Sequence, residues 1–285
     1  MASLPDWLDP LPDAREQRVL DEWAISERGI PGLELMERAG TGLADLVGSL
    51  APEGRIVVVC GKGNNGGDGL VAARVLRERR RQVDVVLLAA AEDLRGDAAT
   101  NLERLPGTRP SSLEAGALAG ARAIVDAILG TGFSGEPREP AAGAIEAINA
   151  AGSDSIVVAC DVPSGVDASS GEVDGAAVRA RATATFHAAK PGLWIEPGKT
   201  HAGEVSVIDI GIPPAGPAEP RIGLIADRVV DGIPRRGRAS TKFAAGSVLV
   251  CGGSRGLTGA PCLASESAMR AGAGYVTACV PASLN

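Results

Sequence analysis

The chain has 285 residues, of which 45% are hydrophobic and 2% aromatic, and its formal net charge is −7. This composition is typical of a globular protein and excludes an intrinsically disordered chain. Because an acidic chain repels the phosphates of nucleic acids, we expect no nucleic-acid partner. The basic run Arg77, Arg79, Arg80 and Arg81 is interpreted as the solvated end of a helix.

No targeting or membrane segment is expected. The sequence begins MASLPDWLDP, which has neither the basic nor the apolar stretch of a signal peptide. No apolar run of about eighteen residues predicts a transmembrane helix, so no membrane partner is expected. The cysteines have no C-x-x-C spacing, which favours buried, reduced thiols in a cytoplasmic protein: Cys60, Cys160, Cys251, Cys262 and Cys279.

Helix and strand patterns alternate along the first two thirds of the chain. Met36, Ala39 and Leu43 recur at helical intervals, whereas short Val-rich runs ended by Gly predict buried parallel strands. The predicted elements are helices at about 12–27 and 32–50, a strand at 56–60, a helix at 67–81, a strand at 83–88, a helix at 95–105, a strand at 123–127, a helix at 141–151, and strands at 156–160, 182–186 and 205–208. This order predicts a Rossmann-like three-layer αβα sandwich with a parallel sheet.

The composition changes after Ile212, where the sequence PPAGPAEPR is typical of a linker. A strand at 247–251, a helix at 261–271 and a strand at 275–280 are predicted beyond it. About 45 residues after the linker are too few to bury a core of their own. The sequence therefore predicts a complete domain over 1–215, a linker over 216–240, and the beginning of a second α/β domain over 241–285.

The first candidate site is the sequence GKGNNGGDG, from Gly61 to Gly69, between a predicted strand and a predicted helix. Its G-x-G-x-x-G pattern lets the backbone approach a pyrophosphate at a helix N-terminus. Asn64 and Asn65 add amide groups, and Asp68 is expected in the first helical turn, where the helix dipole stabilises a carboxylate. The alternative interpretation is a tight turn capped by Asp68.

Two further motifs follow or lie in predicted strands. In DAILGTGFSGE, Asp126 lies in an apolar strand and needs a partner, because burial of a lone carboxylate is costly. The Gly-rich loop at 130–135 is expected to surround a ligand, whereas the alternative is a plain connecting loop. In DVPSGVD, Asp161 follows a strand, with an Asx-type turn as the alternative. Because open parallel sheets bind ligands outside the carboxyl ends of their strands, we expect these motifs to meet at one edge.

A weaker candidate is FHAAKPGL, residues 186–193. Lys190 is a candidate for contacting an anionic ligand, and His187 is a candidate base. For both residues an ordinary surface or packing role is equally open.

Taken together, these motifs resemble those of the NAD(P)HX epimerase family. The sequences GKGNNGGDG, DAILGTG, DVPSGVD and KPGL…GEVSVIDIGIP occur in the order and spacing of that family, after LMERAG at 35–40. The resemblance covers residues 13–214 and implies epimerisation of the R and S forms of hydrated NADH and NADPH. It implies Asp161 as the catalytic residue, and a potassium ion held by Asn65, Asp126 and Ser164. The implied substrate-binding residues are Asn64, Asn65, Gly66, Gly67, Asp68, Gly130, Thr131, Gly132, Phe133, Ser134, Gly135, Glu136 and Asp161.

The tail resembles a second family, the ribokinase-like ADP- or ATP-dependent NAD(P)HX dehydratases. The segments GGSRGLTGA and AMRAGAGYVT are similar to its opening βα unit, and Ala260 is implied as one wall of a substrate pocket. The preceding HKGxxG-type pattern is degraded, since Thr241 and Phe243 replace His and Gly. The resemblance therefore implies a bifunctional type of chain with a truncated dehydratase half.

Two other functions stay open at this point. One is a dinucleotide-dependent oxidoreductase, suggested by G-x-G-x-x-G alone. The other is a non-enzymatic binding protein with the epimerase fold, because a fold does not fix a function. A homodimer and the preference between the two hydrated cofactors also stay open.

Overall fold

The computed structural model describes residues 4–214, 216–234, 237–238 and 240–282. The chain divides into two compact units, Met1–Ala226 and Asp227–Asn285. The first contains the sheet and all of the candidate site residues except Ala260, so it is described first.

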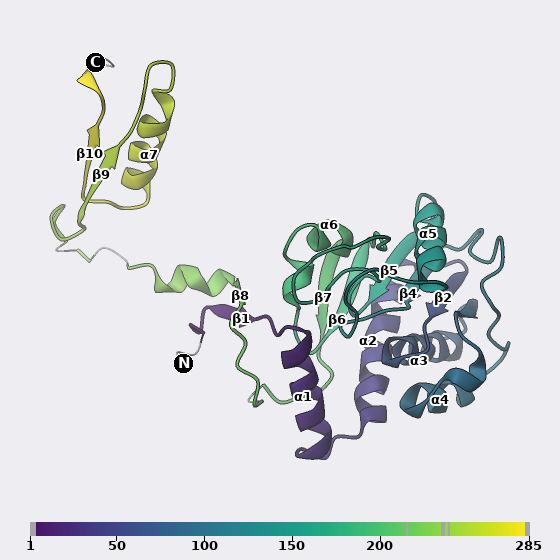
Figure 1. Ribbon diagram of the computed structural model, residues 1–285. Helices are drawn as coiled ribbons and strands as arrows, with labels where there is room; N and C mark the ends of the chain where they lie inside the picture. Colours follow the sequence, from purple (N-terminus) through teal and green to yellow (C-terminus); the bar gives the residue numbers. More distant parts are fainter. Residues whose placement is uncertain (1–3, 215, 235–236, 239, 283–285) are drawn as a thin grey trace. The chain divides into compact units, whose positions relative to one another are not determined.

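The first unit is built on a six-stranded sheet with the order β3-β2-β4-β5-β6-β7, in which every neighbouring pair is parallel (Figure 1). The predicted Rossmann-like parallel sheet is thereby confirmed. Its strands are β2 (Ile56–Cys60), β3 (Val83–Leu87), β4 (Ala123–Ala127), β5 (Ile156–Cys160), β6 (Ala182–Phe186) and β7 (Glu204–Ile208).

Helices cover both faces of this sheet, which completes the three layers (Figure 1). Along β2 the side chains alternate, so that Val58 packs in one core with the helices α2 and α3, whereas Val57 packs in another with α5. The helices are α1 (Ala14–Ser26), α2 (Gly32–Leu50), α3 (Asn64–Glu78), α4 (Gly96–Glu103), α5 (Ala141–Ala151) and the short α6 (Gly198–Ala202), with 3₁₀ turns η1 (Ala91–Asp93) and η2 (Pro191–Leu193).

Helix α3 begins at Asn64, three residues before the predicted start at 67. The prediction treated the Gly-rich stretch as a loop, but tight packing requires glycine inside this helix. A Cβ atom at Gly66 would lie 1.9 Å from the carbonyl oxygen of Gly61, and one at Gly67 would lie 2.7 Å from the sulfur of Met36. Close approach, and not a break in the helix, therefore explains these glycines.

The basic run at the end of α3 is less solvated than predicted. The guanidinium of Arg77 donates to the carbonyl oxygens of Val83, Pro106 and Thr108, and that of Arg81 donates to the carbonyl of Ala51. These arginines tie the helix end to neighbouring loops.

A small antiparallel pair was not predicted. Strand β1 (Leu8–Pro10) pairs with β8 (Gly223–Ile225), which lies in the stretch interpreted as a linker. Three-residue strands carry no measurable periodicity, so neither strand has a signature in the sequence.

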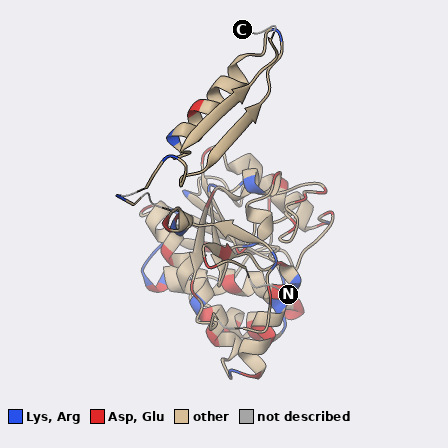
Figure 2. Cartoon of the chain, turned by 90° about the vertical axis from the view of Figure 1, so that its left-hand side faces the viewer, with Lys and Arg blue, Asp and Glu red and all other residues tan. Residues whose placement is uncertain are grey.

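In the second unit, η3 (Asp227–Gly232) is followed by the parallel strands β9 (Ser247–Cys251) and β10 (Tyr275–Cys279), with α7 (Gly259–Arg270) between them in sequence. Neither strand carries a charged residue, as Figure 2 shows. Of the described residues in α7 only Pro261 is buried, and Leu249 and Leu263 are exposed. The expectation of buried thiols is correct for Cys60 and Cys160 but wrong for the three free cysteines of this unit.

The packing of α2 against α3 yields the first prediction. A Cβ atom at Gly40 would lie 2.4 Å from the Cβ of Val71 and 2.7 Å from the carbonyl oxygen of Asp68. We therefore expect Gly40→Ala to lower the free energy of unfolding by about 1–3 kcal/mol in urea titrations.

Gly48→Ala is the matched control, because an added Cβ there meets nothing within 4 Å in the same helix. Its free energy of unfolding should stay unchanged or rise by up to about 1 kcal/mol, since Ala favours the helix. Equal losses in both variants would contradict the steric explanation.

Candidate functional site

The candidate residues converge at the carboxyl edge of the sheet, where the neighbouring strands β2, β4 and β5 end. A cleft of about 1190 Å³ lies there and is lined by residues of α1, α2 and the loops after the strands. Of the residues implied by the resemblance, those that line this cleft are Asn64, Asn65, Asp68, Gly130, Thr131, Gly132, Phe133 and Asp161.

The start of α3, which follows β2, brings Asn65 and Asp68 to the cleft. Both polar atoms of the Asn65 side-chain amide are buried and have no hydrogen-bond partner among the described residues. An unsatisfied buried amide costs about 1–3 kcal/mol, so this side chain is suited to a ligand.

The sequence predicted Asp68 in the first turn of α3, but this prediction is wrong. The helix begins at Asn64, so Asp68 lies in its second turn. Its side chain is 8% exposed. Burial raises the pKa of Asp68 well above its usual value, and the nearby carboxylates of Asp161 and Asp21 raise it further. This environment favours the neutral carboxyl, which can donate a hydrogen bond to a ligand.

Asp126 finds the partner that its position in β4 requires. The carboxylate is fully buried and accepts hydrogen bonds from the Ser164 amide at 2.8 Å, the Ser164 hydroxyl at 2.5 Å and the Ile128 amide at 3.3 Å. Burial raises the pKa of Asp126 to about 6, although the hydrogen bonds from Ser164 and Ile128 lower it. Ser164 is itself buried, and its hydroxyl accepts a hydrogen bond from the amide of Leu129.

Asp161 lies at the end of β5 in the left-handed region, with φ of +66°. One carboxylate oxygen accepts from Lys190 Nζ at 2.9 Å, and the other accepts from the Thr131 amide at 2.8 Å and the Thr131 hydroxyl at 2.5 Å. Burial alone would raise the pKa of Asp161, but Lys190 and the Thr131 hydrogen bonds together hold it below its ordinary value. The carboxylate is therefore kept ionised beside the cleft.

Lys190 has neither the surface role nor the ordinary packing role that the sequence left open. Its side chain is 1% exposed, and its ammonium also donates to Thr185 Oγ1 at 3.0 Å and to the carbonyl of Phe186 at 2.9 Å. His187 does not line the cleft; burial lowers its pKa, Lys190 lowers it further and Asp209 raises it.

The structure brings Asn65 and Asp161 together around Gly130. A Cβ atom at Gly130 would lie 3.0 Å from Asn65 Oδ1 and 3.0 Å from Asp161 Oδ2. A larger residue would press on both side chains where the loop after β4 passes between them.

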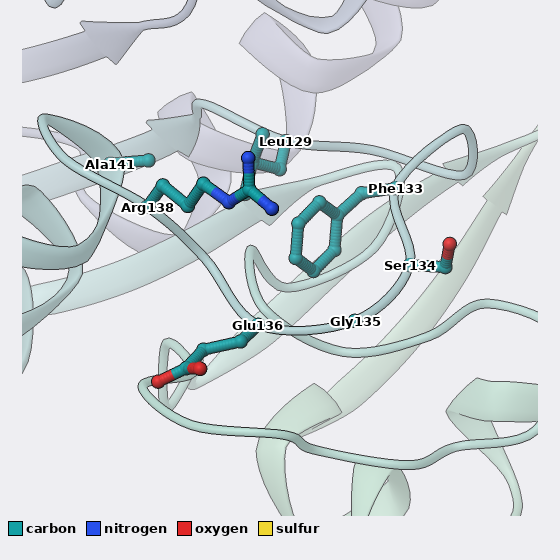
Figure 3. Close-up of a pocket in the computed structure, with 7 residues that line it drawn as sticks. All are labelled: Leu129, Phe133, Ser134, Gly135, Glu136, Arg138 and Ala141. Atoms are coloured by element: carbon teal, nitrogen blue, oxygen red, sulfur yellow. The ribbon is translucent and has the colours of Figure 1, made fainter.

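The rest of that loop borders a second, smaller pocket of about 500 Å³ (Figure 3). Ser134, Gly135 and Glu136 line this pocket and not the cleft, whereas Phe133 lines both. The remaining implied residues are buried and do not line the cleft: Gly66, Gly67, Asp126 and Ser164.

Helix α1 contributes residues that sequence reasoning missed. Gln17 is 5% exposed and donates through Nε2 to Asp21 at 2.9 Å, and both residues line the cleft. Burial raises the pKa of Asp21, while the Gln17 hydrogen bond and Lys190 lower it. The spacing of four residues indicates that Gln17 and Asp21 are neighbours on one helix face. The sequence does not indicate where this helix packs, so it gives no reason to place the pair at the edge of the sheet.

Comparison with known proteins identifies the family. The model described as "YjeF-related protein N-terminus" matches residues 32–192. The chain belongs to this YjeF-related N-terminal family. Among relatives of this family, the Pirellula staleyi "NAD(P)H-hydrate epimerase" is 43% identical over 71% of this chain and 93% of its own length.

Longer relatives match nearly the whole chain. The "Bifunctional NAD(P)H-hydrate repair enzyme Nnr" of Moorella thermoacetica is 43% identical over 94% of this chain, and that of Salinibacter ruber is 39% identical over 97%. The chain spans 53% and 55% of the lengths of these two relatives, which is about half.

A solved structure supports the fold of this YjeF-related domain. The crystal structure of yeast ynu0 covers 75% of the chain and 99% of its own, with a TM-score of 0.59 and 22% identity. None of the helices among the described residues has the length and apolar character needed to cross a membrane. Those residues also contain no group of three His, Cys, Asp or Glu side chains arranged to bind a metal ion.

The ion pair yields the second prediction. Lys190→Met leaves Asp161 as a buried carboxylate without its counter-ion, so we expect it to lower the free energy of unfolding at pH 7 by about 3 kcal/mol. Because the folded pKa of Asp161 is depressed, its stabilising contribution is present above the unfolded pKa and is lost as the pH falls through the folded value. The difference between wild type and variant should therefore shrink in acid.

The control is the double variant Lys190→Met with Asp161→Asn, in which neither partner is charged. Its loss in free energy of unfolding should be smaller than the sum of the losses of the two single variants. Additive losses, measured by urea unfolding across a pH series, would contradict a direct coupling.

Proposed function

We propose that this chain is an NAD(P)H-hydrate epimerase, which interconverts the R and S forms of hydrated NADH and NADPH. The observation that carries the proposal is the ionised Asp161 carboxylate beside the cleft, held by Lys190 and Thr131. The names of the relatives that match this YjeF-related domain support it. They favour neither the oxidoreductase nor the non-enzymatic alternative.

The chemistry of the substrate suits a positioned carboxylate. Its reacting carbon bears a hydroxyl next to a ring nitrogen, and inversion there requires proton transfer to or from that hydroxyl. Asp161 is proposed as the acid–base group. Lys190 keeps the carboxylate ionised and, with Thr131, fixes its orientation. The neutral carboxyl favoured at Asp68 is suited to donating a hydrogen bond to a substrate oxygen.

The hydrated nucleotide is proposed to bind along two groups of implied residues, one at the start of α3 and one in the loop after β4. Asn64, Asn65 and Asp68 come from the start of α3, where free backbone amides and the helix dipole favour a phosphate. Residues 130–136 are proposed to cradle the substrate from the neighbouring strand. Gly66 and Gly67 are proposed to act through the close packing that positions the start of α3.

A potassium ion is proposed at Asn65, Asp126 and Ser164, as the family resemblance implies. The residues fit a hard monovalent cation, because all offer oxygen atoms and the buried Asn65 Oδ1 has no hydrogen-bond partner among the described residues. When bound, the ion would neutralise the buried Asp126 carboxylate and hold the amide of Asn65 in place.

The bifunctional names of the longer relatives suggest an assignment for the tail. We propose residues 1–215 as the epimerase domain, 216–240 as a linker and 241–285 as the start of a ribokinase-like dehydratase domain. Ala260, which is exposed at the first turn of α7, is proposed as part of the dehydratase pocket. ADP- or ATP-dependent dehydration is proposed for the full-length relatives. A cytoplasmic location is proposed for this chain.

The third prediction tests the acid–base role. Asp161→Asn should reduce kcat for epimerisation by about a hundred- to ten-thousand-fold, because general acid–base groups typically contribute that much. Rates are measured by chromatographic separation of the R and S hydrates, after subtraction of the uncatalysed rate. Asp154→Asn, an exposed carboxylate outside the cleft, should keep the wild-type rate. Near-normal turnover by Asp161→Asn would move the proton transfer to another group.

The fourth prediction concerns the ion. Thermal unfolding of the wild type should shift to higher temperature as potassium chloride replaces sodium chloride at constant ionic strength, since a ligand of the native state stabilises it by mass action. Asp126→Asn removes the one charged ligand and should weaken this potassium-specific shift. A wild type that responds equally to both salts would contradict the proposed ion.

A further inference from the structure

The side chains that line the cleft include more acidic than basic groups, although a dinucleotide is itself an anion. Seven carboxylic side chains line it, against four cationic ones: Arg18, Lys62, Arg138 and Lys190. A hydrated dinucleotide carries a pyrophosphate, and the NADPH form adds a 2′-phosphate. An acid-rich cleft repels these groups unless a cation or a helix N-terminus offsets the repulsion at each of them.

The four cations are not equally available. Lys190 is paired with Asp161 and is 1% exposed, so its charge is already compensated. Lys62 lies in the loop before α3, beside the helix N-terminus already assigned to a phosphate. Arg18 and Arg138 are exposed and form no ion pair within the described residues.

Arg138 differs from Arg18 in its position. It lines both the large cleft and the adjoining 500 Å³ pocket, whereas Arg18 lines the cleft alone. In Figure 3 the guanidinium of Arg138 projects toward the ring of Phe133, while the carboxylate of Glu136 points away from both. The junction between the two cavities therefore combines an uncompensated cation with an apolar ring.

The backbone around Arg138 is constrained. Pro137 precedes it and is buried, and Pro140 occupies the N-cap position of α5. Proline fixes its own φ angle and restricts the residue before it, so the backbone on both sides of Arg138 is restricted and loses less freedom when a ligand binds. A cation held on such a segment is better prepared for an anion than one on a free loop.

We propose that Arg138 binds a phosphate group of the hydrated dinucleotide at the junction of the two cavities, next to Phe133. This inference rests on the proposed epimerase function and adds a residue outside the implied set. The planar guanidinium matches phosphate oxygens through two parallel hydrogen bonds. The phosphate belongs either to the pyrophosphate or to the 2′ position, and the two sources predict different substrate dependence.

The test compares Arg138→Gln with the matched variant Arg18→Gln, which removes the same charge from the cleft alone. KM and kcat for epimerisation are measured with hydrated NADH and with hydrated NADPH. Arg138→Gln should raise KM about tenfold and leave kcat within about twofold, because a remote phosphate contact is made in the ground state and the transition state alike. Arg18→Gln should raise KM by clearly less.

The two substrates identify the phosphate. A rise in KM for hydrated NADPH alone assigns Arg138 to the 2′-phosphate, and an equal rise for both assigns it to the pyrophosphate. Unchanged KM values for both substrates, or the same rise in Arg18→Gln, would overturn the inference, since only the overall charge of the cleft would then matter.

A binding readout separates this inference from the proposed function. Thermal stabilisation of each protein by a fixed concentration of hydrated NADPH requires no turnover. If the wild type is stabilised without epimerising, and Arg138→Gln is not stabilised, the proposed function fails and the Arg138 contact stands. If hydrated NADPH does not stabilise the wild type, both fall.

Discussion

The buried ion pair between Lys190 and Asp161 is the contact on which the site most depends. The two residues follow the neighbouring strands β6 and β5, so their contact joins two strand ends at the edge that carries the cleft. All three donors of the ammonium are used, on Asp161, Thr185 and Phe186. An ammonium that is 1% exposed is tolerated only with such complete compensation. Asp161 has a left-handed backbone conformation, which a non-glycine residue rarely adopts, at the point where it accepts the hydrogen bond from Lys190.

Three carboxyl groups near one edge illustrate how environment sets chemistry. Asp161 is buried but paired with an ammonium, and its pKa is lowered. Asp126 is buried with neutral donors only, and its pKa rises to about 6. Burial raises the pKa of Asp68 well above its ordinary value, and the charges of Asp161 and Asp21 raise it further, while Lys190 lowers it only in part. Carboxyl groups whose environments separate their pKa values are suited to opposite roles in proton transfer.

The fold and the meeting of the motifs were predictable, because both follow from local rules. Alternating helices and Val-rich strands specify a parallel sheet, and the carboxyl ends of its strands must share one edge. The burial of Lys190 was not predictable, since KPG reads equally well as a surface turn. The same holds for Gln17 and Asp21, because nothing in the sequence of α1 states which edge of the sheet it covers. Each of these positions depends on contacts between residues that are far apart in the sequence, and a short stretch of sequence does not reveal such contacts.

The glycines of the site explain both the success and the limit of motif recognition. Gly61 lies where a Cβ atom would be 2.2 Å from the carbonyl oxygen of Ile128, so the loops after β2 and β4 touch through their backbones. Gly130 leaves room for the side chains of Asn65 and Asp161 on either side. Gly66 does not line the cleft, and an added methyl group there would strike the backbone of Gly61. A glycine-rich motif can therefore be recognised as one unit, although its members act differently. Gly130 leaves space for neighbouring side chains, whereas Gly61 and Gly66 let backbone segments approach closely.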